Sequence, residues 1–137
     1  MKCHVYANGE LIGWVELIST DPPMGCVSGP FNPNDNYKKI QPVIREHHLY
    51  DGSFGKKDEK KLQEVQANIN AMCIIAITDD GEVLDPVGGV CIDDFSGELD
   101  EDPYQLSVLG LEHDTFTRLF PLAHQEYLNS FKVKEQD

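Results

Sequence analysis

The residues best suited to chemistry in this chain are carboxylates that gather between two predicted strands. Carboxylate oxygens can chelate Ca²⁺ or pair with Lys and Arg of a partner protein. The acidic stretch comprises Asp93, Asp94, Glu98, Asp100, Glu101 and Asp102. Its spacing differs from an EF-hand loop, because the alternating acidic positions and the terminal Glu are missing. We therefore expect a contact for a basic protein partner, without a metal ion or another cofactor.

Two other interpretations of the acidic stretch stay open. The carboxylates can simply be solvated, as charge runs often are. Alternatively, the chain is a small carboxylate- or metal-dependent enzyme, with Asp93, Asp94 and Glu98 as ligands or as acid and base. The enzyme hypothesis requires these three side chains to converge in a concave pocket.

The net charge of -13 comes entirely from one segment. Residues 62–117 contain no Lys or Arg and thirteen carboxylates, whereas the other residues balance eleven of each sign. If these carboxylates share one face, their field favours a basic partner and disfavours nucleic acid and anionic membrane. The size and charge are those of immunity-type inhibitors that cover a cationic nuclease toxin, which is an analogy from physical properties alone.

The histidines and cysteines give weaker signals. His47 and His48 are adjacent, which on a helix points them about 100° apart, and no zinc-ligand spacing is present. The four cysteines are widely spaced, as free thiols in a reducing compartment are, so we expect a cytoplasmic protein. A periplasmic protein with two disulfides stays open. A nucleophilic site of Cys26, His47 and Asp21 would require a tertiary coincidence.

Residues 21–33 contain four prolines and two glycines. Proline fixes φ and glycine permits close backbone approach, so the segment is predicted to form a rigid corner. A functional alternative is an apolar rim that anchors a protein partner, because exposed apolar side chains mark interaction sites. The residues of that rim are Trp14, Pro22, Pro23, Met24 and Phe31.

Asn8-Gly9 predicts a two-residue hairpin between strands at residues 2–7 and 10–17. The register then pairs Ala7 with Glu10, Val5 with Ile12 and Cys3 with Trp14. It places Cys3, Val5, Ile12 and Trp14 on one buried face.

The remaining pattern predicts further strands and helices. Strands are expected at residues 24–31 (an edge strand), 73–77 (a central strand), 82–84, 87–95 and 104–111. Helices are expected at residues 34–40, 43–49, 56–70 and 114–131, with a break at Pro42 and a kink or split at Pro121. No run of residues is apolar and long enough to span a membrane, and no secretory signal is visible.

These elements predict a single α+β domain over residues 1–131, with a frayed tail at 132–137. Its sheet is expected to be mostly antiparallel, with about five or six strands, helices packed on one side and a long C-terminal helix. An edge strand could also pair two copies, so a homodimeric structural module is a further hypothesis.

Several short stretches together resemble a pattern found in small bacterial proteins without an assigned reaction. They are residues 13–17 (GWVEL), 21–25 (DPPMG), 29–31 (GPF), 40–42 (IQP), 81–84 (GEVL), 88–96 (GGVCIDDFS) and 108–111 (VLGL). The resemblance spans most of the chain and implies a bacterial cytoplasmic protein. It implies no catalytic residue.

Overall fold

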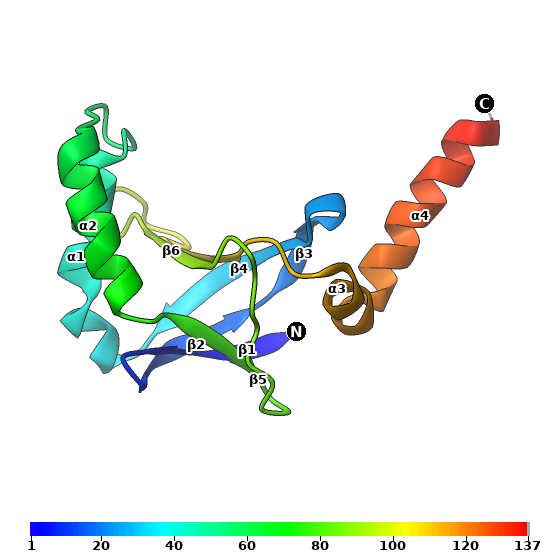
Figure 1. Ribbon diagram of the computed structural model, residues 1–137, viewed down its shortest axis with the longest axis horizontal. Coiled ribbons are helices and arrows are strands. Elements are labelled where there is room, and N and C mark those ends of the chain that lie inside the picture. The colour runs from blue at the N-terminus through cyan, green and yellow to red at the C-terminus, as the bar shows by residue number, and fades with distance from the viewer. Residues whose placement is uncertain (137) are drawn as a thin grey trace.

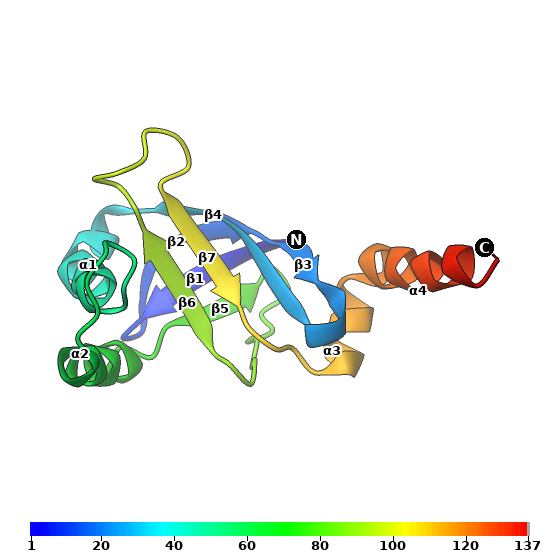
Figure 2. The same ribbon diagram turned by 90° about the horizontal axis from the view of Figure 1, so that it is seen from above.

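Seven antiparallel strands form a curled sheet in this computed structural model, which describes the backbone of residues 1–136 and the side chains of residues 1–131. The strands are β1 (Lys2–Ala7), β2 (Glu10–Glu16), β3 (Ile18–Asp21), β4 (Cys26–Pro33), β5 (Ile75–Thr78), β6 (Val90–Asp94) and β7 (Tyr104–Val108). They are arranged in the order β5-β1-β2-β4-β7-β6, and β3 pairs with β4 beside this path. The predicted α+β class is confirmed (Figures 1 and 2).

The helices lie at two opposite ends of the sheet (Figure 1). A 3-10 helix, η2 (Asp35–Lys39), leads into α1 (Gln41–Tyr50), and α2 (Glu59–Ala71) packs beside α1. At the other end lie the 3-10 turn η1 (Pro22–Met24), α3 (His113–Leu119) and α4 (Pro121–Gln136), which projects from the body. Among the described residues, no helix combines the length and apolar character needed to cross a membrane.

The prolines shape the helices largely as predicted. Pro42 occupies the first turn of α1, where its missing N–H costs no helical hydrogen bond. Pro121 separates α3 from α4, so the predicted C-terminal helix is split. The tail predicted for residues 132–137 ends at Asp137, outside the described residues, and its fraying stays a prediction.

The first hairpin differs from its predicted register by one residue. Ala7 pairs with Glu10 as expected, but a β-bulge between Val5 and Tyr6 shifts the rest of the hairpin. Val5 therefore pairs with Gly13, and Cys3 pairs with Val15. The bulge buries Val15 completely and leaves Trp14 39% exposed, so the prediction that Trp14 is a core residue is wrong.

Two strands have exchanged roles relative to the prediction. β4 is a central strand that pairs with β2 and β3 on one side and with β7 on the other, although Pro30 suggested an edge. β5 is the strand at one edge of the sheet, with β1 as its only partner strand in the described part of the chain. Beyond β5, residues 82–84 form an isolated bridge instead of the predicted strand.

Candidate functional site

A buried carboxylate organises the end of β6 from which the acidic loop (residues 95–103) departs. The Asp94 side chain is completely buried and accepts three short hydrogen bonds. The Tyr37 hydroxyl donates at 2.6 Å, the Gln41 amide at 3.0 Å and the Ser96 backbone N–H at 2.9 Å. Burial alone would raise the pKa of Asp94, but these hydrogen bonds outweigh it and hold the pKa below its ordinary value.

Tyr37 is fixed by the same contact. Its ring is buried in the core, edge-on to Phe31 and Tyr104. Burial and the hydrogen bond to ionised Asp94 raise the pKa of the Tyr37 hydroxyl above its usual range. The hydroxyl therefore stays a proton donor to the carboxylate at every physiological pH.

Arg45 joins α1 to the acidic loop. Its Nη1 donates to the Asp94 carbonyl oxygen at 3.1 Å and lies 3.5 Å from Asp94 Oδ1. Both guanidinium nitrogens also reach Glu98, at 2.8 and 3.2 Å, in a bidentate pair. The hydrogen bond to Arg45 lowers the pKa of Glu98. Arg45 thus holds the first half of the loop against the helix.

His48, on the same face of α1 as Arg45, also holds the end of β6 at Asp94. Its Nε2 accepts a hydrogen bond from the Asp94 N–H at 3.1 Å, and its Nδ1 lies 3.3 Å from Asp51 Oδ2. The ring stacks on Phe95, with centroids 5.0 Å apart. Because Nε2 is the acceptor, the proton of neutral His48 sits on Nδ1 and is donated to Asp51.

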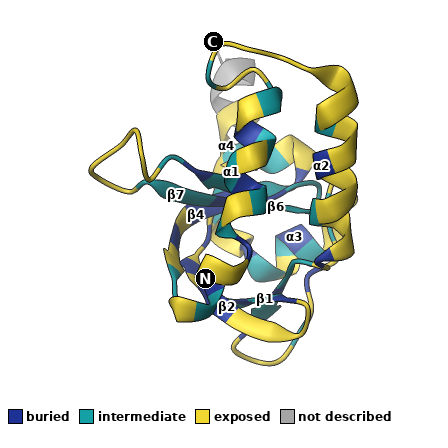
Figure 3. Ribbon diagram, turned by 90° about the vertical axis from the view of Figure 1, so that its left-hand side faces the viewer, coloured by how far each residue is buried: buried dark blue, intermediate teal, exposed yellow. Residues whose placement is uncertain are grey.

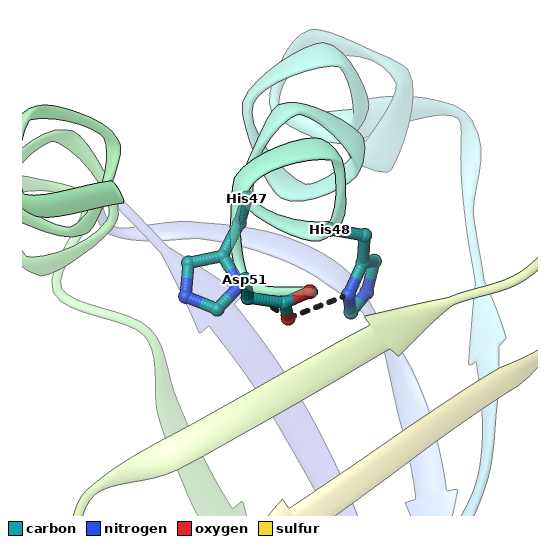
Figure 4. A group of neighbouring side chains, drawn as sticks. All are labelled: His47, His48 and Asp51. Atoms are coloured by element: carbon teal, nitrogen blue, oxygen red, sulfur yellow. Dashed lines mark hydrogen bonds and ion pairs between the residues drawn. The ribbon is translucent and has the colours of Figure 1, made fainter. Parts of the chain in front are cut away.

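This tautomer opposes metal binding at the most ligand-like cluster of the described residues. His47, His48 and Asp51 each place one possible ligand atom within 4.8 Å of the others (Figure 4). A protonated Nδ1 of His48 has no lone pair for a metal ion, and freeing it would require giving up the bond from Asp94. Asp51 Oδ1 is also occupied, by the Ser53 N–H at 2.7 Å. These side chains instead form a hydrogen-bond network that links α1 to β6 and to the Ser53 loop.

The six acidic candidates fall into two groups. Asp94 and Glu98 are engaged within the chain, and Asp94 offers no surface to a partner. Asp93 is half exposed on β6, while Asp100, Glu101 and Asp102 are exposed at the tip of the loop. Figure 3 shows that this loop stands out from the sheet and is exposed along most of its length.

The predicted single acidic face is not present. Glu98 pairs with Arg45 of α1, whereas Glu82 pairs with Arg118 of α3, at 2.7 and 2.8 Å, and these helices lie at opposite ends of the molecule (Figure 1). Carboxylates of the acidic segment therefore lie at both ends of the molecule, and Glu98 and Glu82 are each paired with an arginine.

The predicted apolar rim is dispersed as well. Pro23 and Met24 are exposed at η1, close to α4, and Pro22 beside them is partly buried. Trp14 lies on β2 beneath the Lys2 ammonium, 4.7 Å from the ring centroid. Phe31 is 3% exposed within the core, so it cannot contribute to a rim.

The structure brings together two of the three carboxylates named in the enzyme hypothesis, because Asp94 and Glu98 both contact Arg45. Their pKa values are lowered, whereas a general acid at neutral pH needs a raised pKa, so this pair does not suit that role. Cys26 lines an apolar groove near η1, while His47 lines a different cavity beside α1 and α2, so the hypothetical pair of Cys26 and His47 does not form. All four cysteines are free, and burial raises the pKa of the Cys3 thiol to about 11.

Sequence reasoning missed Tyr37, Gln41 and Arg45. One usable signal was present: Gln41, Arg45 and His48 follow the i, i+4, i+7 spacing that places side chains on one helix face. No family model matches this chain, and no curated protein or solved structure matches it either.

Proposed function

We propose that this protein is a binding module that presents the tip of its acidic loop to a basic surface of another protein. The observation that carries the proposal is the anchoring of the loop. Asp94 and Glu98 are bound from inside, while Asp100, Glu101 and Asp102 beyond them remain exposed. A loop fixed at its base loses less conformational entropy on binding, which increases affinity.

A cationic nuclease toxin is a partner class that fits this chemistry, with this protein as its immunity-type inhibitor. The tip would steer association through its charge and then insert between basic side chains of the partner. The four free thiols support a reducing compartment such as the bacterial cytoplasm. The proposal needs only three tip carboxylates and does not require a continuous acidic face.

The test compares two variants that remove the same amount of charge. Asp100→Asn/Glu101→Gln/Asp102→Asn neutralises the tip, and Glu64→Gln/Asp80→Asn/Asp85→Asn neutralises exposed residues elsewhere. Asn tolerates the positive φ of 44° at Asp102, so the loop conformation is kept. The basic partner is first isolated by low-salt capture on the wild-type protein, and its association rate is then measured against each variant at rising salt.

We expect the tip variant to lower the association rate about 10-fold at low salt and to flatten its salt dependence. The control variant should change the rate less than about 3-fold. Equal losses for both variants would mean that only total charge matters, and the loop would have no special role.

A second candidate function is self-association through the end of the molecule formed by η1, α3 and α4. The specific observation is exposed apolar surface: Met24 is 64% exposed, Val87 89% and Leu122 79%. Beside them lies an apolar groove of about 420 Å³, lined by Met24, Cys26, Val87, Leu109 and Leu111 among others. Apolar surface of this kind is typical of protein interfaces.

A further inference from the structure

β6 has one edge that no strand covers. It pairs with β7 on one side and is the last strand of the sheet in the described part of the chain. Leu109 N–H donates to Gly89 and Phe95 N–H donates to Pro103, so the odd-numbered residues of β6 face β7. In an antiparallel pair the alternate residues point the other way, so Val90, Ile92 and Asp94 direct their N–H and C=O groups to the free edge.

Side chains of α1 close one end of this edge. The Asp94 N–H donates to His48 and the Asp94 C=O accepts from Arg45. These are the two backbone groups that an added strand would need, so no strand can pair at Asp94. The outer edge of β5 is closed by the chain itself, because Thr78 N–H donates to Glu82 and Leu84 N–H donates to Ala76. Exposed edges are usually blocked in such ways, so the stretch from Val90 to Ile92 stands out.

A crevice of about 300 Å³ runs along this open stretch. One wall is β6 from Val90 to Asp93, and the opposite wall is formed by α1, α2 and residues 73–74. Ile44, Ile69 and Ile74 give it apolar surface, and His47, Gln66 and Asn70 give it polar surface. Three residues of strand span about 10 Å, so the crevice admits a short extended chain and not a second sheet.

The charge of the crevice indicates which chain it admits. No Lys or Arg is among its lining residues, and the half-exposed Asp93 carboxylate lies on its β6 wall. A basic side chain beside Asp93 would gain an ion pair, whereas an acidic one would be repelled.

We propose that a short extended cationic peptide segment of a partner protein adds as a strand to β6 at Val90–Ile92. Its backbone exchanges hydrogen bonds with these two residues, its apolar side chains enter the crevice, and one Lys or Arg side chain meets Asp93. This inference does not depend on the acidic loop, because its hydrogen bonds come from β6 itself.

The first test uses a probe of that chemistry with the full-length protein. The peptide acetyl-Val-Lys-Val-Lys-Val-amide is titrated while the backbone amide resonances are followed by NMR, and a twin with every backbone nitrogen methylated serves as control. The twin keeps the side chains and charge but has no N–H to donate. We expect shifts at Val90 and Ile92 and an affinity at least about 10-fold lower for the twin, corresponding to the loss of two hydrogen bonds.

A matched pair of variants tests the same edge from the protein side. Val90→Pro removes an N–H that faces the crevice and leaves the β6–β7 hydrogen bonds intact, while Val90→Ala shortens the side chain and keeps the N–H. We expect about a 10-fold loss of affinity for Val90→Pro and less than about a 3-fold loss for Val90→Ala. If Val90→Pro does not fold, the test rests on comparing the affinities of the peptide and its methylated twin for the wild-type protein.

Three results would overturn the inference. The methylated twin could bind as tightly as its parent, which would show simple charge attraction. The shifts could be confined to Asp100–Asp102, which would support the acidic-loop function but not strand addition. The protein could instead self-associate through this edge, with a concentration-dependent mass that Val90→Pro abolishes and no binding of the peptide.

Discussion

Asp94 is ionised although it is fully buried, because hydrogen-bond donors surround it on every side. Tyr37, Gln41 and Ser96 each donate to one of its oxygens, and Arg45 lies next to it. A buried charge is tolerated when it is hydrogen-bonded and paired, whereas removing one partner from such a network is costly. The residue therefore stabilises the junction of η2, α1 and β6, from which the acidic loop begins.

Asp94→Asn should destabilise the fold by about 2–4 kcal/mol at neutral pH. The new NH2 group cannot accept a hydrogen bond, so it would face either Tyr37 and Gln41 or the Ser96 N–H and Arg45, and those hydrogen bonds are lost or must reorganise. Urea unfolding measures the effect, with Asp93→Asn as the control, because Asp93 is half exposed next to the network. The control should change the free energy of unfolding by less than about 0.5 kcal/mol. Equal effects would show that the buried network contributes little.

The same carboxylate predicts how stability depends on pH. The pKa of folded Asp94 lies below its ordinary value of 3.8, so the unfolded chain binds its proton first as pH falls. Its contribution to stability is complete above about pH 5 and is lost as pH falls through 3.8 toward the folded-state pKa. Unfolding measured between pH 6 and pH 3 should show a shallower acid decline in Asp94→Asn than in the wild type. A parallel decline in both proteins would assign the acid sensitivity to other carboxylates.

At the scale of elements, the β-bulge in the first hairpin shows where sequence reasoning succeeds and fails. Asn8-Gly9 correctly predicted the turn and the pairing of Ala7 with Glu10, because turn type is a local property. The bulged part of β2 also packs against β4, where Phe31 and the Asn32 carbonyl leave no room for a Cβ atom at Gly13. Such a tertiary contact has no local signature, so the buried residue became Val15 instead of Trp14.

The buried network was unpredictable for a related reason. Its members lie on η2, α1 and β6, more than forty residues apart in sequence between Arg45 and Asp94. The sequence marked Asp94 as one acid among six, and only the packing of α1 against β6 separates the buried carboxylate from the exposed ones. Local patterns predicted β6, β7 and the acidic loop between them, but not that Asp94 at the end of β6 would be buried.

Gly13→Ala should destabilise the protein by on the order of 3 kcal/mol. A Cβ atom at this position would overlap the Asn32 carbonyl oxygen and lie 2.8 Å from the Phe31 ring, so β2 and β4 would have to separate. Gly81→Ala is the comparison, because a Cβ there meets nothing within 4 Å. That control loses only the positive φ of a turn, at about 1 kcal/mol. Thermal and urea unfolding rank the two variants, and an equal cost would show that β2 and β4 adapt easily.

At the scale of the whole molecule, the two ends of the sheet have different characters. The α1–α2 end holds the anchored acidic loop and the crevice beside β6. The α3–α4 end exposes apolar side chains, and α4 projects away from the body with few contacts to it (Figure 2). A partner bound at the first end would therefore leave the second end free for a second copy of the chain.

Self-association at the α3–α4 end predicts a mass that depends on concentration. Leu122→Gln/Leu128→Gln removes two exposed apolar side chains from α4, which are 79% and 40% exposed. Leu49→Gln/Leu99→Gln is the matched control, since both residues are 51% exposed but lie on α1 and in the acidic loop, away from α3 and α4. Sedimentation over a 100-fold range of concentration should show a dimer for the wild type and the control, and a dimer at least about 10-fold weaker for the α4 variant, because burial of apolar side chains drives association. A wild-type protein that stays monomeric throughout, or a dimer that both variants weaken equally, would remove α4 as the interface and leave the exposed groove as a site for a different protein.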